Sequence, residues 1–142
     1  CPYVDAARRA KEPGKRVIDD VARHVDGRHL QELWARRQPF YPEGRGDLLE
    51  RFIVDALKAG PRAAEGHRVV GRYVMEPRLP LVRCPTLVIA PMADPHAHPH
   101  AQTIAANIAG SKLIEIEAGT VPLPDHMPHA FAAAIDQFLS SH

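Results

Sequence analysis

Side chains that could act as nucleophiles are scarce in this sequence. Its 142 residues include three serines, Ser111, Ser140 and Ser141, and two cysteines, Cys1 and Cys84. Two cysteines this far apart provide neither a disulfide framework nor a metal-binding spacing, so a reducing, cytoplasmic compartment is expected. Cys84 precedes a proline at the start of an apolar run, and we interpret it as a small buried residue. Cys1 lacks a neighbour that would activate an N-terminal nucleophile.

An excess of charge of one sign and long apolar runs are also missing. The chain has 18 basic and 17 acidic residues, a formal net charge of +1. This balance gives no electrostatic reason to expect nucleic acid or an anionic membrane as a partner. No apolar run approaches the roughly 20 residues that a membrane-spanning helix needs. The composition is that of one soluble globular domain, and the opening "CPYVDAARR", without an initiator methionine, is typical of the interior of a longer protein.

The first half of the sequence, residues 1–79, predicts helices and loops. Apolar side chains recur at helical spacing in 14–26, 47–60 and 61–76, and the last segment begins with a proline, which the first turn of a helix favours. Phe52 and Tyr73 lie on the apolar faces of their segments, so we expect them in the core. A loop of Pro, Gly and aromatic residues, "RRQPFYPEGRGD", spans 36–47. No strand is predicted in this half.

The second half, residues 80–142, has a different pattern. "PTLVIAP" is a short apolar run between prolines, typical of a strand buried on both faces of a parallel sheet, and "SKLIEIEAG" predicts a second strand. Helices are expected over 100–110, with Ile104 and Ile108 facing inward, and over 128–141. In the last one the apolar positions are Phe131, Ala134, Ile135, Phe138 and Leu139. The order β-α-β-α predicts a right-handed crossover and a covering helix.

Two parallel strands do not form a stable sheet by themselves, since a buried strand needs neighbours and covering helices. The first half supplies no strand. We therefore expect a segment outside this sequence to complete the sheet.

The stretches "LPLVRCPTLVIAPMADPHAHPHAQTIAANIAGSKLIEIEAG" and "PHAFAAAIDQFL" resemble the C-terminal part of α/β-hydrolase-fold enzymes. The resemblance implies an α/β fold that is an incomplete α/β-hydrolase fold. Residues 1–79 would form the helical cap, and 80–142 the C-terminal β-α-β-α part of the core. The N-terminal part of such enzymes carries the oxyanion loop and the nucleophile in a G-x-S-x-G turn, and none of the three serines lies in that setting. The implied partner is the missing N-terminal half, in the same or a separate chain, or a second copy through self-association.

The resemblance also implies catalytic positions. Asp94 matches the acid, which would orient a histidine and stabilise its imidazolium, although an Asp before a proline is also a common start of a turn. In the family a histidine directly follows the glycine that is Gly119 here. This chain has Thr120 instead, whose hydroxyl cannot act as a base near neutral pH. His126 is the candidate replacement, with the alternative that both His126 and His129 are simply exposed residues at a helix start.

A second polar pattern is the segment "DPHAHPH", where Asp94, His96, His98 and His100 alternate. Alternating histidines can chelate Zn²⁺, Ni²⁺ or Cu²⁺, but the spacing matches no recognised zinc motif. We expect no functional metal and no cofactor.

The aromatic residues Trp34, Phe40 and Tyr41 are the candidates for binding a substrate, because the cap of such enzymes lines the pocket. The implied function is hydrolysis or transfer of an acyl group from a small, apolar ester- or lactone-like molecule, once the N-terminal part is present. The alternative is an inactive binding module that lost its histidine at Thr120.

Overall fold

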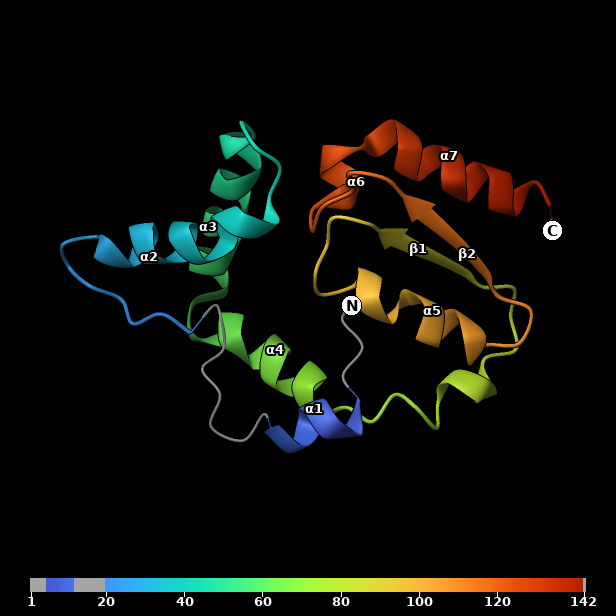
Figure 1. Ribbon diagram of the computed structural model, residues 1–142. Coiled ribbons are helices and arrows are strands. Elements are labelled where there is room, and N and C mark those ends of the chain that lie inside the picture. The colour runs from blue at the N-terminus through green and yellow to red at the C-terminus, as the bar shows by residue number, and fades with distance from the viewer. Residues whose placement is uncertain (1–4, 12–19, 142) are drawn as a thin grey trace. The chain divides into compact units, whose positions relative to one another are not determined.

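The computed structural model describes residues 5–11 and 20–141 (Figure 1). The chain folds into two compact units. Ala6–Tyr73 form the first, called here the helical unit, and the chain from Val74 onward builds the second, called the sheet unit. In the described part of the chain, no helix combines the length and the apolar character needed to cross a membrane.

The helical unit contains α1 (Ala6–Lys11), α2 (Arg28–Arg37), α3 (Gly46–Ala59) and α4 (Ala63–Arg72), with 3₁₀ turns at Gln38–Phe40 and Gly60–Arg62. The predicted helices over 47–60 and 61–76 are thereby confirmed in position, although α4 ends earlier than expected. The apolar face of α3 buries Leu48 and Leu49, and this helix packs against α2 and α4. At its start, hydrogen bonds from the Arg45 guanidinium to the Asp47 carboxylate lower the pKa of Asp47.

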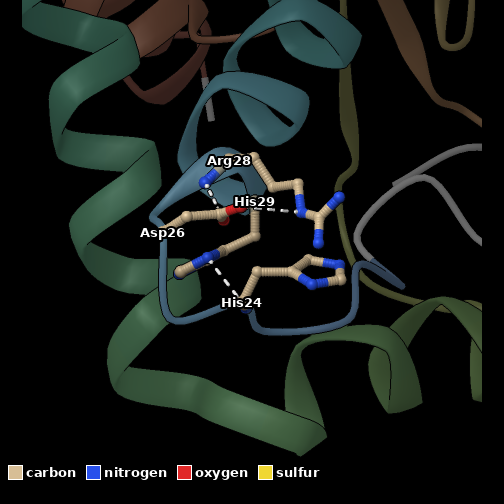
Figure 2. A network of polar contacts seen from close by, with 4 residues as sticks. All are labelled: His24, Asp26, Arg28 and His29. Carbon is tan, nitrogen blue, oxygen red and sulfur yellow. Dashed lines mark hydrogen bonds and ion pairs between the residues drawn. The ribbon is translucent and has the colours of Figure 1, made fainter.

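The prediction of a helix over 14–26 is wrong for those of its residues that the structure describes. Residues 20–26 are not helical, and 14–19 lie outside the described residues. Figure 2 shows the turn that takes their place: Asp26 accepts a hydrogen bond from the backbone N–H of Arg28 at 3.1 Å and pairs with its Nε at 3.2 Å. The backbone N–H of His24 donates to Nδ1 of His29 at 3.2 Å, and Gly27 adopts a left-handed φ of 76°. Local side-chain bonds of this kind compete with helix formation, so the helix begins only at Arg28.

Tyr73 was expected in the core, and this is wrong because α4 ends at Arg72. Tyr73 adopts an extended conformation after the helix and is half exposed. Phe52 is partly buried, with the Arg37 guanidinium 4.5 Å above its ring and the Tyr41 ring centroid 6.3 Å away.

The sheet unit follows the predicted β-α-β-α order. It contains the 3₁₀ turn Leu79–Leu81, β1 (Leu87–Pro91), α5 (His98–Ala106), β2 (Lys112–Ile116), the single turn α6 (Leu123–His126) and α7 (Pro128–Leu139). The two strands are parallel, with Leu87 opposite Lys112 and Pro91 opposite Ile116. Helix α5 lies on one face of the strand pair and α7 on the other (Figure 1). This is the layered arrangement of a partial α/β fold.

Burial in the sheet unit is uneven. Ala90 and Pro91 are buried, but Leu87, Val88 and Ile89 are only half-buried. Since the described sheet has two strands, each strand has one paired and one open edge. The strand expected to be buried on both sides is therefore only partly covered by the described residues. Elsewhere in the sheet unit, Leu79 and Ile108 form a small core with Met75, Val82 and Ile104 packed against them, as predicted for the two isoleucines.

One further prediction of burial is wrong, and one apolar position of the last helix is exposed. Cys84 is exposed, because it lies in the bend before β1 and not in the strand. Leu139 is 63% exposed, since it is the last residue of α7, one position past the buried Phe138.

Candidate functional site

The loops that follow β1 and β2 are held side by side at the carboxyl ends of the strands. The backbone N–H of Met92 donates to the Ile116 carbonyl at 3.0 Å, and that of Ala93 donates to the Gly119 carbonyl at 2.8 Å. These bonds extend the pairing of the strands by two residues into the loops. The carboxyl end of a parallel sheet is where α/β folds bind their ligands, so polar groups on these loops are candidates for chemistry.

Asp94, on the first loop, is a buried carboxylate with two backbone donors. The residue is 7% exposed, and Oδ1 accepts hydrogen bonds from the N–H groups of His96 at 2.7 Å and Ala97 at 3.1 Å. Its own carbonyl accepts from the N–H of His98 at 3.1 Å. Asp94 therefore shapes the turn into α5, which is the alternative that the sequence left open. Within the described chain, Oδ2 accepts no hydrogen bond, so half of the carboxylate is not used by the turn.

Gly119, on the second loop, lies where a side chain has no room. A Cβ atom there would lie 2.9 Å from Cδ1 of Leu123 and 3.0 Å from both the Ile116 carbonyl oxygen and Cβ of Pro91. The absence of a side chain lets this loop approach the end of β1 closely. The same approach brings Thr120 to the edge of the strand pair.

Thr120 and His126 are hydrogen-bonded to each other. Oγ1 of Thr120 lies 3.1 Å from Nδ1 of His126, and both side chains are half-buried. His126 is the last residue of α6, and its backbone N–H donates to the Pro122 carbonyl at 2.8 Å, which fixes the turn. The chain thus returns a histidine to the residue that follows Gly119. His129, one turn further into α7, is exposed.

Nδ1 of His126 contacts Thr120 and not Asp94. The hydrogen bonds recorded for the described residues include none between Asp94 and His126. Within the described residues, Nε2 of His126 has no hydrogen-bond partner. The structure brings the two predicted loops together, and it directs the histidine toward the threonine.

The alternating histidines of 96–100 do not converge on one point. Nε2 of His98 lies 2.9 Å from Oε1 of Glu115, on β2. In the described ranges, no three His, Cys, Asp or Glu side chains gather closely enough to hold a metal ion.

A separate apolar hollow lies within the helical unit, between α2 and α3. It has a volume of about 500 Å³ and is lined by Leu30, Gln31, Trp34, Glu50, Ile53 and Val54. Trp34, predicted as a substrate contact, is among the lining residues, whereas Phe40 and Tyr41 are not. Sequence reasoning missed Leu30, Ile53 and Val54 as pocket residues, because apolar side chains at helical spacing are typical of a core.

Together, a parallel strand pair with helices on both faces and polar loops at its carboxyl end defines a partial α/β fold with a candidate site. No protein-family model and no curated protein matches the chain. Among solved structures, it is similar to "The crystal structure of a hydrolase from Pseudomonas aeruginosa PA01", with a TM-score of 0.62 and 26% identity. The match covers 94% of this chain and 48% of that one, so this chain spans about half the length of the hydrolase.

Proposed function

We propose that the chain is the helical cap and C-terminal core part of an α/β-hydrolase-type enzyme. When joined to the N-terminal part, it hydrolyses or transfers the acyl group of a small, apolar ester- or lactone-like substrate. The observation that carries the proposal is the 2.8 Å bond between Ala93 and Gly119, which holds the Asp94 loop beside the Thr120–His126 loop. The likeness to a hydrolase along 94% of the chain supports it.

In this proposal His126 is the general base. Its Nε2 takes the proton from a hydroxyl nucleophile of the completing segment as the oxygen attacks the substrate carbonyl. The resulting imidazolium then gives that proton to the leaving alkoxide, so the histidine ends neutral. Asp94 is the proposed acid, and its Oδ2, which accepts no hydrogen bond within the described chain, supplies negative charge on the neighbouring loop.

The proposed acyl-binding surface is the hollow between α2 and α3. Its lining is largely apolar, with Trp34 as the one aromatic side chain, and its volume of about 500 Å³ suits a small ligand. Phe40 and Tyr41, in the turn after α2, are proposed as further substrate contacts.

The completing part is an N-terminal half of the core, in the same or a separate chain, or a second copy of this chain. The open edges of the strand pair support such a partner, since unpaired edge N–H and C=O groups are a template for further pairing. A reducing, cytoplasmic setting agrees with the exposed free thiol of Cys84.

The test is hydrolysis of p-nitrophenyl esters and simple lactones by the protein as it occurs, with any completing segment present. We expect turnover of neutral, apolar acyl groups, and weak turnover of a matched acyl chain that ends in a carboxylate. An alkyl fluorophosphonate should form an adduct on a hydroxyl residue of the completing segment, located by peptide mass spectrometry. If the protein showed no turnover and formed no adduct, the proposal would be contradicted.

The second candidate is an inactive binding module that keeps the hollow and has lost the base. Thr120 after Gly119, and the use of Asp94 in the turn, favour it. It predicts saturable ester binding by calorimetry without turnover, and Thr120→His would restore measurable hydrolysis if the nucleophile is intact.

A further inference from the structure

The hydrogen bond between Thr120 and His126 has two forms that differ in chemistry. Either the threonine hydroxyl donates to Nδ1, leaving the proton of the imidazole on Nε2, or Nδ1–H donates to Oγ1, leaving a lone pair on Nε2. The hydrogen bond of one ring nitrogen decides which nitrogen carries the proton. Only the second form lets Nε2 accept a proton.

Within the described chain, Thr120 is the hydrogen-bond partner of Nδ1 of His126, and no hydrogen bond joins this nitrogen to either carboxylate oxygen of Asp94. A hydroxyl has two acceptor lone pairs, so Oγ1 can accept from Nδ1 and still donate its own hydrogen to water. Thr120 is β-branched and follows the tightly packed Gly119, which limits the directions that its hydroxyl can take.

We propose that Thr120 is a positioning residue that holds His126 in its Nδ1–H tautomer, with Nε2 free to act as the base. The threonine thus takes over the orienting part that a carboxylate plays in an acid–histidine pair. Asp94 keeps the turn into α5 and contributes charge without a direct bond. The catalytic consequence rests on the proposed function, whereas the tautomer can be measured without it.

The experiment uses the protein as it occurs, labelled with ¹⁵N-histidine, at a pH where the imidazole is neutral. Long-range ¹H–¹⁵N spectra distinguish a protonated from an unprotonated ring nitrogen, and His126→Gln identifies the signals of His126. Thr120→Val removes the acceptor with little change in shape, and Thr120→Ser keeps a hydroxyl as the matched control. Melting temperatures of both variants establish that they fold.

We expect a protonated Nδ1 in the wild type and in Thr120→Ser, and a shift toward protonated Nε2 in Thr120→Val. On a p-nitrophenyl ester, kcat should fall about fivefold in Thr120→Val, the factor that corresponds to loss of a hydrogen bond of about 1 kcal/mol, and should stay within about twofold in Thr120→Ser. A protonated Nε2 in the wild type, or an unchanged tautomer in Thr120→Val, would overturn the inference. The expected tautomers in a protein without turnover would support the positioning role and contradict only the proposed function.

Discussion

Asp94 forms the turn into α5, and in the proposed function the same carboxylate also acts as the acid; substitutions at this residue can separate the two roles. Asp94→Asn keeps an oxygen that can accept from the His96 and Ala97 N–H groups but removes the charge. We expect this variant to fold normally and to lose about tenfold in kcat, because a neighbouring negative charge stabilises an imidazolium. Asp94→Ala should also lose about 1–3 kcal/mol of stability, since buried donors lose their acceptor.

Ester hydrolysis and urea unfolding of the two variants test this. If Asp94→Asn retained full activity while Asp94→Ala lost only stability, Asp94 would be a turn former and not part of the catalytic pair.

A second prediction concerns the stability of a variant at Gly119. Gly119→Ala places a methyl group within 2.9–3.0 Å of three neighbours, two of them on the backbone or a rigid ring. We expect a loss of about 1–3 kcal/mol, the usual cost of overpacking, and a lower ester turnover because the loop must shift. Thermal unfolding measures the effect.

Gly66, in the middle of α4, is the matched control. A Cβ atom there would contact nothing within 4 Å. Gly66→Ala should therefore stabilise the helical unit by about 0.5–1 kcal/mol through helix propensity. Equal and small effects at both glycines would contradict the close approach at Gly119.

At the scale of elements, the sequence predicted those segments whose periodicity is long and uninterrupted. Helices α3 and α7 were predicted because one apolar face persists over three turns, and β1 was predicted because its apolar run lies between two prolines. The prediction of a helix over 14–26 failed in its described part. Local hydrogen bonds of Asp26 and the positive φ of Gly27 form a turn there. The prediction that Tyr73 lies in the core failed because periodicity does not indicate the residue at which a helix ends.

The candidate site was predictable only in part, for a similar reason. A resemblance in the sequence places Asp94 and Gly119 on adjacent loops, and the bond from Ala93 to Gly119 agrees with this. The contact between Thr120 and His126 depends on the single turn α6, which bends the chain back over six residues. Four residues with two prolines nearby carry no periodic signal from which that bend could be inferred.

The hollow between α2 and α3 leads to a prediction about the affinity for substrate. Trp34→Ala should raise KM for the longer apolar esters about tenfold and leave kcat nearly unchanged, because the indole would bind substrate and transition state alike. Val69→Ala, at an exposed position of α4, is the control and should change neither constant. The measurement is a series of p-nitrophenyl esters of increasing acyl length.

A fall in kcat without a change in KM would place Trp34 elsewhere in the mechanism. An unchanged KM for every chain length would remove the hollow from the substrate path.

At the scale of the whole molecule, the two-stranded sheet is the weak point. Leu87, Val88 and Ile89 remain half-buried with helices on both faces, since the described residues provide β1 with one neighbour. Residues 1–142 expressed alone should therefore be insoluble, molten or self-associated, because open apolar edges recruit further strands. Near-UV circular dichroism and sedimentation measure this. A monomer that unfolds cooperatively would argue against the need for a completing segment.

His126 is proposed to supply the base of a hydrolase, and the kcat of His126→Ala measures this role. His129→Ala is the matched control, as an exposed histidine three residues away on α7. In the protein as it occurs, His126→Ala should lower kcat for a p-nitrophenyl ester about 10²-fold or more, as loss of a general base does, and His129→Ala should leave it within about twofold. Full activity in His126→Ala would contradict the claim.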